Sequence, residues 1–314
     1  MLPDVPHVYV SISALSTFCK RISELSNTSG IEERQKWLFF EKLIFEQSKV
    51  FLSLDDEQIK EYVNYSPKEK ELFVRENNFS PVLIPYLDRL LSNGLKITSC
   101  KRIVDALAEN NFESYFEQDE QPIFIFLDKA KDCCDQISQQ IGAFVISKDF
   151  HFDKENTEVK ADFISANENV RYDQIFRNIP PFQWLLISDP YFFDKQNITG
   201  KVLISILESL NVKDREIDLT IYFIDNEKIN PRTVEENLKK QFPKLKMTFV
   251  SGTKLTISHD RSIFTNTFWI VCEYGFKGRY PGTTKFIRFP LNTYYPIYKK
   301  TYEKIFRGGN HRLN

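Results

Sequence analysis

Short apolar runs of the kind found in buried strands alternate with amphipathic helices in the C-terminal half of the chain. Residues 184–187 and 217–224 are strongly apolar stretches that are too short for a typical helix. A helical pattern lies between them at residues 198–210, and a second one follows at residues 231–242, where Asn230 is the expected N-cap. Strands and helices that alternate in this order predict an α/β fold.

A run of strand candidates follows this alternating segment, with no helix between them. The candidates cover residues 245–250, 253–258, 262–264 and 268–274, and a final helix is predicted at residues 294–307. Consecutive strands without crossover helices pair antiparallel, so we expect a mixed sheet in this part of the chain.

The N-terminal half also alternates helix and strand signals. Strands are predicted within residues 6–17 and at 95–99, 123–127 and 143–147, and helices at 32–51, from Pro67 onward, and at 81–95, 100–110 and 132–141. Residues 150–169 are polar and charged. We therefore expect an N-terminal α/β lobe of unknown role at residues 1–150, a linker or surface loop at 151–181, and a C-terminal lobe at 182–314.

Composition excludes several classes of protein. The chain is 42% hydrophobic and 27% charged with balanced signs, which excludes intrinsic disorder. Its apolar runs fall far short of the ~20 residues of a membrane-spanning helix, and its start lacks a secretion signal. The 5 cysteines have no paired spacing, which predicts reduced thiols and a cytoplasmic location. The 4 histidines share no ligand spacing with them, so we expect no metal and no cofactor.

Positive charge is concentrated at the C-terminal end. Residues 277–314 hold nine Lys and Arg but one acid, Glu303, whereas the whole chain has a net charge of −1, so the remainder is acidic. Such an end attracts anions, with nucleic acid or phosphates the usual candidates. The expected nucleic-acid contacts are Lys285, Arg288, Lys299 and Lys300.

Two alternatives stay open for this basic end. Its charges could simply solvate the final helix, since a one-sided charge distribution does not identify a partner. The tyrosines of residues 294–298 could stack on bases beside the lysines, or could dock the final helix onto the body of the lobe.

A histidine and an arginine two residues apart, His259 and Arg261, follow the strand predicted at residues 253–258. Side chains at i and i+2 of an extended strand project to one face, ~6.5 Å apart. An imidazole and a guanidinium placed in this way can grip one phosphate, and Asn266 could fix the tautomer of the imidazole. The structural alternative is that His259 is a hydrogen-bonded strand residue and that Arg261 pairs with Asp260 or Asp189.

Acidic residues follow two of the predicted strands. Asp189 and Asp225 come at the carboxyl edge of the sheet, where α/β proteins usually gather their ligands. We expect these two, with Asp260, to support the site.

The block from His259 to Asn266 resembles the H-x-K-x4-D signature of the phospholipase D superfamily, with Arg261 in place of Lys and Asn266 in place of Asp. The order of elements between Asp189-Pro190-Tyr191 and Tyr274-Gly275-Phe276 is similar to one half of that fold. The resemblance covers residues 182–289. It is closest to the degenerate C-terminal domain of MIT-domain proteins, which binds phosphoinositide-bearing membranes without known catalysis, and related bacterial proteins carry similar domains.

In active members of that superfamily two such motifs meet, and one His becomes the phosphohistidine nucleophile. Only one motif is present here, and Asn266 removes the carboxylate that would stabilise an imidazolium. The resemblance therefore implies a phosphate-recognising, catalytically impaired module of a bacterial cytoplasmic protein. His259 and Arg261 would hold the phosphate, and nucleic acid is the expected ligand.

Two further functions stay open. One is an active, metal-independent phosphodiesterase or nuclease that works as a homodimer, with His259 and Asn266 in catalysis. The other is a protein-interaction component of a phage-defence system, in which the acidic N-terminal lobe contacts a partner protein.

Overall fold

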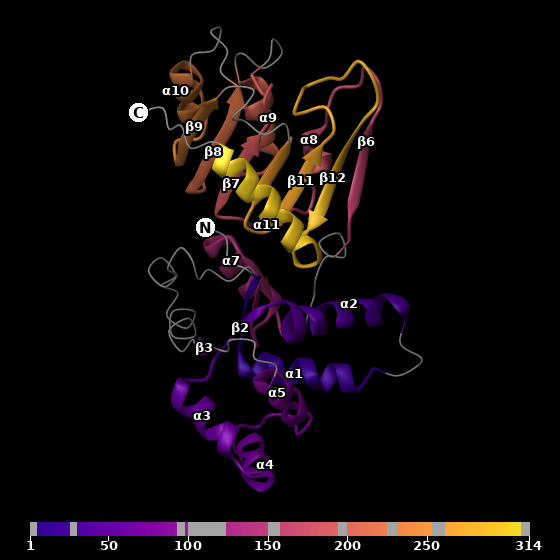
Figure 1. The fold of residues 1–314 in the computed structure, drawn as a ribbon, viewed down its shortest axis with the longest axis vertical. Coiled ribbons are helices and arrows are strands. Elements are labelled where there is room, and N and C mark those ends of the chain that lie inside the picture. Colours follow the sequence, from indigo (N-terminus) through magenta and orange to yellow (C-terminus); the bar gives the residue numbers. More distant parts are fainter. Residues whose placement is uncertain are drawn as a thin grey trace. The chain divides into compact units, whose positions relative to one another are not determined.

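The computed structural model describes residues 5–25, 30–92, 98–99, 124–149, 158–193, 200–224, 231–252 and 261–308. The chain forms two compact units, residues 1–157 and 158–314, and each is an α/β structure built on its own sheet (Figure 1). The predicted α/β class is confirmed. Among the described residues, no helix has the length and apolar character needed to cross a bilayer.

Unit 1 is built on a five-stranded parallel sheet in the order β3-β2-β1-β4-β5. Its strands are β1 (His7–Val10), β2 (Lys49–Leu52), β3 (Thr98–Ser99), β4 (Phe124–Phe126) and β5 (Phe144–Ile146). All four residues of the central strand β1 are buried. Strand β4 falls within the continuous apolar run of residues 123–127, as expected of a strand buried on both faces.

Helices α1 (Ile12–Ser23), α2 (Ile31–Lys42), α3 (Asp56–Asn64), α4 (Pro67–Glu76), α5 (Leu83–Ser92) and α7 (Lys131–Ile141) belong to the same unit. Helix α4 begins as predicted, with a capping box between Ser66 and Glu69. The helix expected at residues 32–51 is shorter: α2 passes into a π-helical turn, Leu43–Gln47, and the chain then enters β2. The helix expected at residues 100–110 lies outside the described residues.

Unit 2 is built on a seven-stranded mixed sheet in the order β6-β12-β11-β10-β7-β8-β9. Strands β7 (Trp184–Ser188), β8 (Ile217–Ile224) and β9 (Leu245–Gly252) are parallel. Strands β10 (Ser262–Thr265), β11 (Phe268–Cys272), β12 (Thr284–Pro290) and β6 (Lys160–Ile164) continue the sheet antiparallel. The predicted mixed sheet is thus present, with β6 and β12 as strands that the sequence patterns did not reveal.

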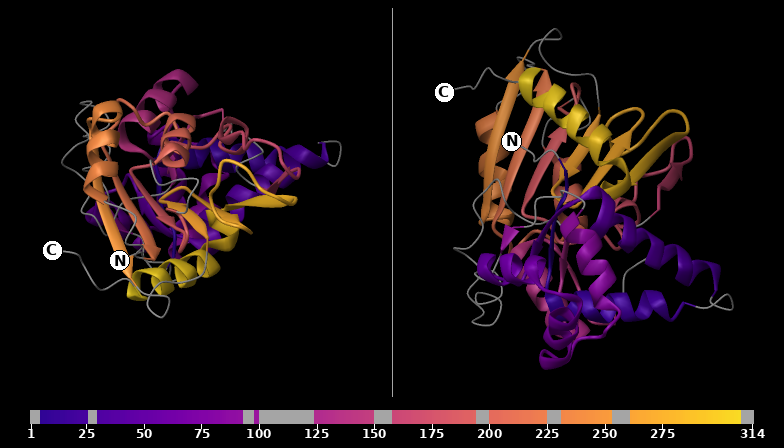
Figure 2. Two further views of the ribbon diagram at one scale, coloured as in Figure 1. Left: turned by 90° about the horizontal axis from the view of Figure 1, so that it is seen from above. Right: turned by 60° about the horizontal axis from the view of Figure 1, so that its bottom comes forward.

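Helices cover both faces of the sheet of unit 2. On one face, α8 (Tyr172–Ile175), α9 (Lys201–Ser209) and α10 (Pro231–Gln241) enclose the main core with buried strand residues such as Ile187, Ile221 and Ile270. On the other face lies α11 (Leu291–Gly308), whose Tyr298 ring is 5.4 Å from that of Phe264 in β10 (Figure 2). We name these the core face and the α11 face.

Residues 158–181, where a linker or surface loop was expected, are instead part of unit 2. Strand β6 pairs with β12 along its whole length, and Tyr172 of α8 is buried in the main core. Strand β6 is an edge strand with half-buried and exposed side chains in alternation, so its sequence is polar even though its backbone is paired.

Candidate functional site

The carboxyl end of β7 carries Asp189, whose side chain is 2% exposed. Its Oδ1 accepts the backbone N–H of Tyr191 at 2.9 Å, and its Oδ2 accepts the backbone N–H of Phe276 at 2.8 Å. Burial raises the pKa of this carboxyl, while the two N–H donors and the nearby charges of Arg261 and Lys277 act against that rise. Asp189 therefore ties two separate turns to the end of one strand.

Arg261 lies beside Asp189 because β10 runs antiparallel to β7, with Ser262 opposite Ser188. Its Nε is 3.9 Å from Asp189 Oδ1, and its Nη1 donates a hydrogen bond of 2.8 Å to the carbonyl of Glu273. The guanidinium is also 5.9 Å from the centroid of the Tyr191 ring. The side chain remains 27% exposed. Contacts with Asp189 and Glu273 thus hold the guanidinium in place, while part of the side chain stays accessible to solvent.

The turn after β11 is shaped around this pair. Gly275 has a φ of +82°, and a Cβ at this position would lie 3.1 Å from Arg261 Cδ and closer still to the Asp189 carboxylate. Its carbonyl accepts hydrogen bonds from the Cys272 thiol, at 2.8 Å, and from the Tyr280 hydroxyl. Only glycine combines this backbone conformation with such a close approach, so the shape of the turn depends on Gly275.

Chemically, this arrangement suits an oxyanion. A guanidinium presents a planar set of N–H donors that match a phosphate, and the pairing is strongest where the donors are already fixed in place. Half-buried Lys277 adds a second positive charge near the carboxyl end of β7. The carboxyl edge of the parallel strands is also where open α/β sheets usually hold their ligands.

The structure brings two of the predicted site residues together, Asp189 and Arg261. This is the ion pair that the structural alternative anticipated, and it is compatible with a ligand because part of the guanidinium stays exposed. His259, Asp260 and Asp225 lie outside the described residues.

Asn266 is not brought to the site. It follows β10 at the end opposite Arg261, five residues away along an extended strand, or roughly 16 Å. Its Oδ1 accepts the backbone N–H of Gln183 at 2.9 Å, just before β7 begins. Asn266 therefore links the end of β10 to the start of β7.

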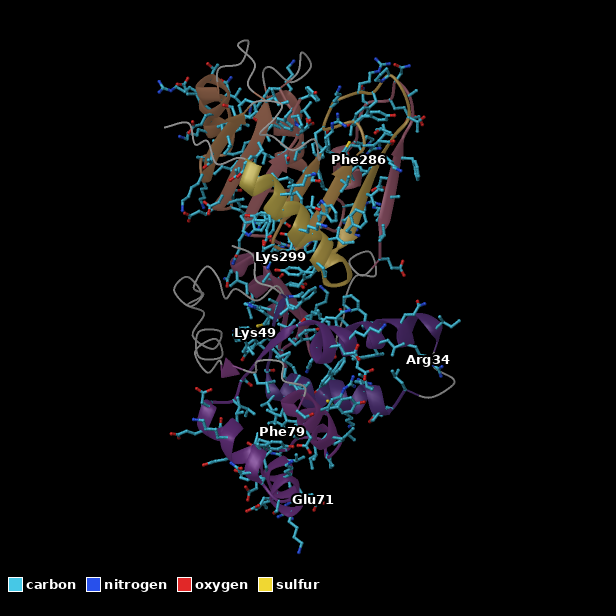
Figure 3. All side chains as sticks on the ribbon, viewed as in Figure 1. Arg34, Lys49, Glu71, Phe79, Phe286 and Lys299 are labelled. Carbon is cyan, nitrogen blue, oxygen red and sulfur yellow. The ribbon has the colours of Figure 1, made fainter. Side chains whose placement is uncertain are left out.

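The four predicted nucleic-acid contacts do not form one surface with Arg261. Arg288 corrects our expectation: it is buried, and its Nη1 donates to the carbonyl of Arg177 at 3.0 Å. Lys299, on α11, is 18% exposed and pairs with Glu303 at 3.7 Å (Figure 3).

Lys285 and Lys300 are exposed, but Lys285 alternates along β12 with Phe286, which is buried in the main core. Lys285 thus points to the α11 face, whereas Arg261 stands two residues before the core residue Ile263 and so shares the core face with it.

Two tyrosines near the start of α11, Tyr295 and Tyr298, belong to the interior. Tyr295 and Tyr298 are 1% and 0% exposed, and the Tyr298 hydroxyl donates to the carbonyl of Thr265 at 2.7 Å. Of the two alternatives for this cluster, docking of the final helix is the one that the structure supports.

Sequence reasoning missed Tyr191, Lys277 and the carbonyl of Glu273 as parts of the site. A signal for the turn was present, because a glycine directly after a strand pattern suggests a close backbone approach. Nothing in the sequence indicated that Arg261 would donate to a main-chain oxygen. Among the described residues, no three His, Cys, Asp or Glu side chains gather closely enough to hold a metal ion.

Unit 1 contains a groove of about 800 Å³ between α4 and the start of α5. It is lined in part by Leu72, Arg75 and Ile84, and by Glu71 and Phe79, which Figure 3 labels. The protein partner expected for the N-terminal lobe stays a prediction.

Comparison with known proteins finds no family model that matches this chain. No curated protein matches it either. Among solved structures, it is similar to TrmBL2, described as an archaeal chromatin protein with a novel mode of DNA binding, at 10% identity and a TM-score of 0.30. That match covers 49% of this chain and 54% of TrmBL2, so the similarity spans about half of each protein and is too low to identify a shared fold.

Proposed function

We propose that unit 2 binds phosphodiester groups of nucleic acid at Arg261 and does not hydrolyse them. The observation that carries the proposal is the fixed and partly exposed guanidinium, held by Asp189 and by the Glu273 carbonyl at the carboxyl edge of β7. A guanidinium held in this way loses little side-chain entropy when it binds an anion.

Two features of the sequence favour a phosphodiester as the anion. His259 stands two residues before Arg261, as in the phospholipase D signature that the segment resembles. The C-terminal segment from Lys277 onward is strongly basic, which raises the local concentration of a polyanion and speeds its encounter with the site.

The position of Asn266 favours binding without turnover. The chain has one such motif, with an amide where the signature has a carboxylate, and this amide binds the backbone of Gln183 at the far end of β10. It supplies no carboxylate that could stabilise a charged imidazole, and such a carboxylate contributes greatly where a His–Asp pair is catalytic.

The binding test uses the full chain and a fluorescein-labelled oligonucleotide of about 12 nucleotides, followed by fluorescence anisotropy. Arg261→Ala should weaken binding by about 10- to 100-fold, the effect expected for loss of a charge-assisted hydrogen bond. Arg261→Lys retains a charge beside Asp189 but not the planar set of donors. Its affinity for the oligonucleotide should lie between that of the wild type and that of Arg261→Ala.

Lys246→Ala is the matched control. It removes one positive charge near the exposed amino end of β9, which is an edge strand of the same sheet. Lys246 pairs there with Glu216. Affinity should be nearly unchanged. Equal weakening by Lys246→Ala and Arg261→Ala, at unchanged thermal stability, would show that only overall charge matters and would contradict the proposed site.

Hydrolysis is tested separately, in EDTA, with single- and double-stranded DNA and RNA and a chromogenic diester. We expect no cleavage above that of a His259→Ala variant prepared in parallel. Cleavage that disappears with His259→Ala would instead establish the active phosphodiesterase.

A further inference from the structure

We infer that Tyr191 and Tyr274 form a base-stacking subsite beside Arg261, so that the ligand of unit 2 is single-stranded nucleic acid. The inference rests on the proposed function, because the stacked base belongs to the same ligand whose phosphate Arg261 holds. It goes further because it names the class of nucleic acid and two residues that would stack on its bases.

Tyr191 lies on the turn that follows β7. The residue is 42% exposed, although its backbone N–H is bound by buried Asp189. The guanidinium of Arg261 lies 5.9 Å from the ring centroid, within the range of a cation–π contact. An exposed ring is thus held on a fixed backbone directly beside the phosphate-binding group.

Tyr274 lies on the turn that follows β11, and it is 54% exposed. Its neighbours on the turn are Glu273, whose carbonyl accepts the hydrogen bond from Arg261 Nη1, and Gly275, where an added Cβ would lie 3.1 Å from Arg261 Cδ. The next N–H along the turn, that of Phe276, is bound by the second oxygen of Asp189. One buried carboxylate therefore fixes both of the turns that carry the tyrosines.

Exposed tyrosines beside an arginine are a common means of holding unpaired bases. Aromatic rings accept any base by stacking, and a neighbouring cation binds the backbone of the same strand. In a duplex the faces of the bases are occupied by their neighbours, so stacking on a protein ring requires single-stranded ligand. This predicts a preference for single strands with little preference for sequence.

The chain offers a matched aromatic control in Phe163 of β6. This residue is 70% exposed, more than either tyrosine, and it belongs to the same unit. It pairs with Lys285 across the β6–β12 ladder, and the two side chains share the α11 face, whereas Arg261 and Asp189 lie on the core side of the sheet. Phe163→Ala therefore removes an exposed ring and leaves the site unchanged.

The experiment compares an oligo(dT) of about 12 nucleotides with an abasic oligonucleotide of the same length and charge, by anisotropy with the full chain. The wild type should bind oligo(dT) about tenfold or more tightly than the abasic strand, given the usual strength of base–aromatic stacking. Tyr191→Ala and Tyr274→Ala should each reduce affinity for oligo(dT) several-fold and leave affinity for the abasic strand unchanged. Tyr191→Phe, Tyr274→Phe and Phe163→Ala should all behave as the wild type.

The outcomes separate this inference from the proposed function. Equal binding of the two strands by the wild type, or tyrosine variants that weaken both strands alike, would leave phosphate binding at Arg261 standing and overturn the base subsite. A wild type that binds neither strand would overturn both. Thermal unfolding of each variant distinguishes a lost contact from a lost fold.

Discussion

The carboxylate of Asp189 occupies the space that a side chain at Gly275 would need. Gly275 adopts a φ of +82°, and a Cβ built on it would lie 3.1 Å from Asp189 Cγ and nearer to Oδ2 than real Cβ atoms approach. Because the same carboxylate binds the N–H groups of Tyr191 and Phe276, the turn after β11 and the turn after β7 hold each other in place. The position of Arg261 depends on both.

Gly275→Ala should destabilise the protein by about 2–4 kcal/mol, because it combines left-handed backbone strain with a clash against a buried carboxylate that cannot move away. Gly282→Ala is the control, since nothing lies within 4 Å of the added Cβ there and its effect should stay within about 0.5 kcal/mol. Denaturant unfolding measures both. Similar stability of the two variants would contradict the close packing described for this turn.

The raised pKa of Asp189 makes a prediction about pH. Burial is the largest cause of the rise, so the folded protein binds the proton of this carboxyl more readily than the unfolded chain does. The stabilisation from this group is then complete below the unfolded pKa of about 3.9 and is lost as the pH rises through the folded value. The free energy of unfolding of the wild type, relative to Asp189→Asn, should therefore fall as the pH increases from about 4. A difference that rises with pH would mean that the Arg261 and N–H partners outweigh burial.

Tyr298→Phe should cost about 1–3 kcal/mol in stability, because it leaves the buried carbonyl of Thr265 without its hydrogen bond of 2.7 Å. The affinity for an oligonucleotide should not change, since this side chain is 0% exposed. Tyr274→Phe removes a hydroxyl from a residue that is 54% exposed and should leave stability unchanged. Weaker oligonucleotide binding by Tyr298→Phe at unchanged stability would contradict this, and would mean that Tyr298 contacts the ligand.

Thiol reactivity gives a test of the core beneath the site. Cys272 is buried, and burial raises its pKa to about 11, so its thiol should resist alkylation in the native state. Cys133 is half-buried and should react with iodoacetamide at about pH 8 before the buried thiols of Cys19, Cys134 and Cys272 do. Peptide mass spectrometry follows each cysteine separately, and denaturant should make all of them reactive. Labelling of Cys272 at the rate of Cys133 would contradict the packing of Cys272 against Gly275 and Tyr280.

The parts of the fold that could be read from the sequence are those with a continuous apolar pattern. Strand β8 has the predicted bounds, Ile217–Ile224, because it lies between two parallel strands and only Asp218 and Thr220 interrupt its apolar residues. Strand β12 escaped prediction because Lys285 and Arg288 made its sequence appear to be part of a basic tail. Arg288 is buried through a hydrogen bond to a main-chain carbonyl, and no pattern in the sequence specifies such a partner.

The candidate site was predictable in its residue types and only partly in its geometry. The positions of Asp189 and Arg261 at strand ends follow from the apolar runs beside them. Their meeting depends on the antiparallel pairing of β10 with β7, in which Ser262 lies opposite Ser188, and this register is set by packing of the whole sheet. Strand β10 itself separates Arg261 from Asn266, so the two residues of the motif lie at opposite ends of one strand.

The dependence of oligonucleotide affinity on salt tests most directly whether Arg261 contacts a phosphate. Each phosphate contact to a single strand contributes about 0.7 to the slope of log affinity against log salt concentration. The slope of Arg261→Ala should be smaller than that of the wild type by about this amount, while Lys246→Ala keeps the wild-type slope. An unchanged slope for Arg261→Ala, in a variant that remains folded, would contradict the assignment of Arg261 as the phosphate-binding residue.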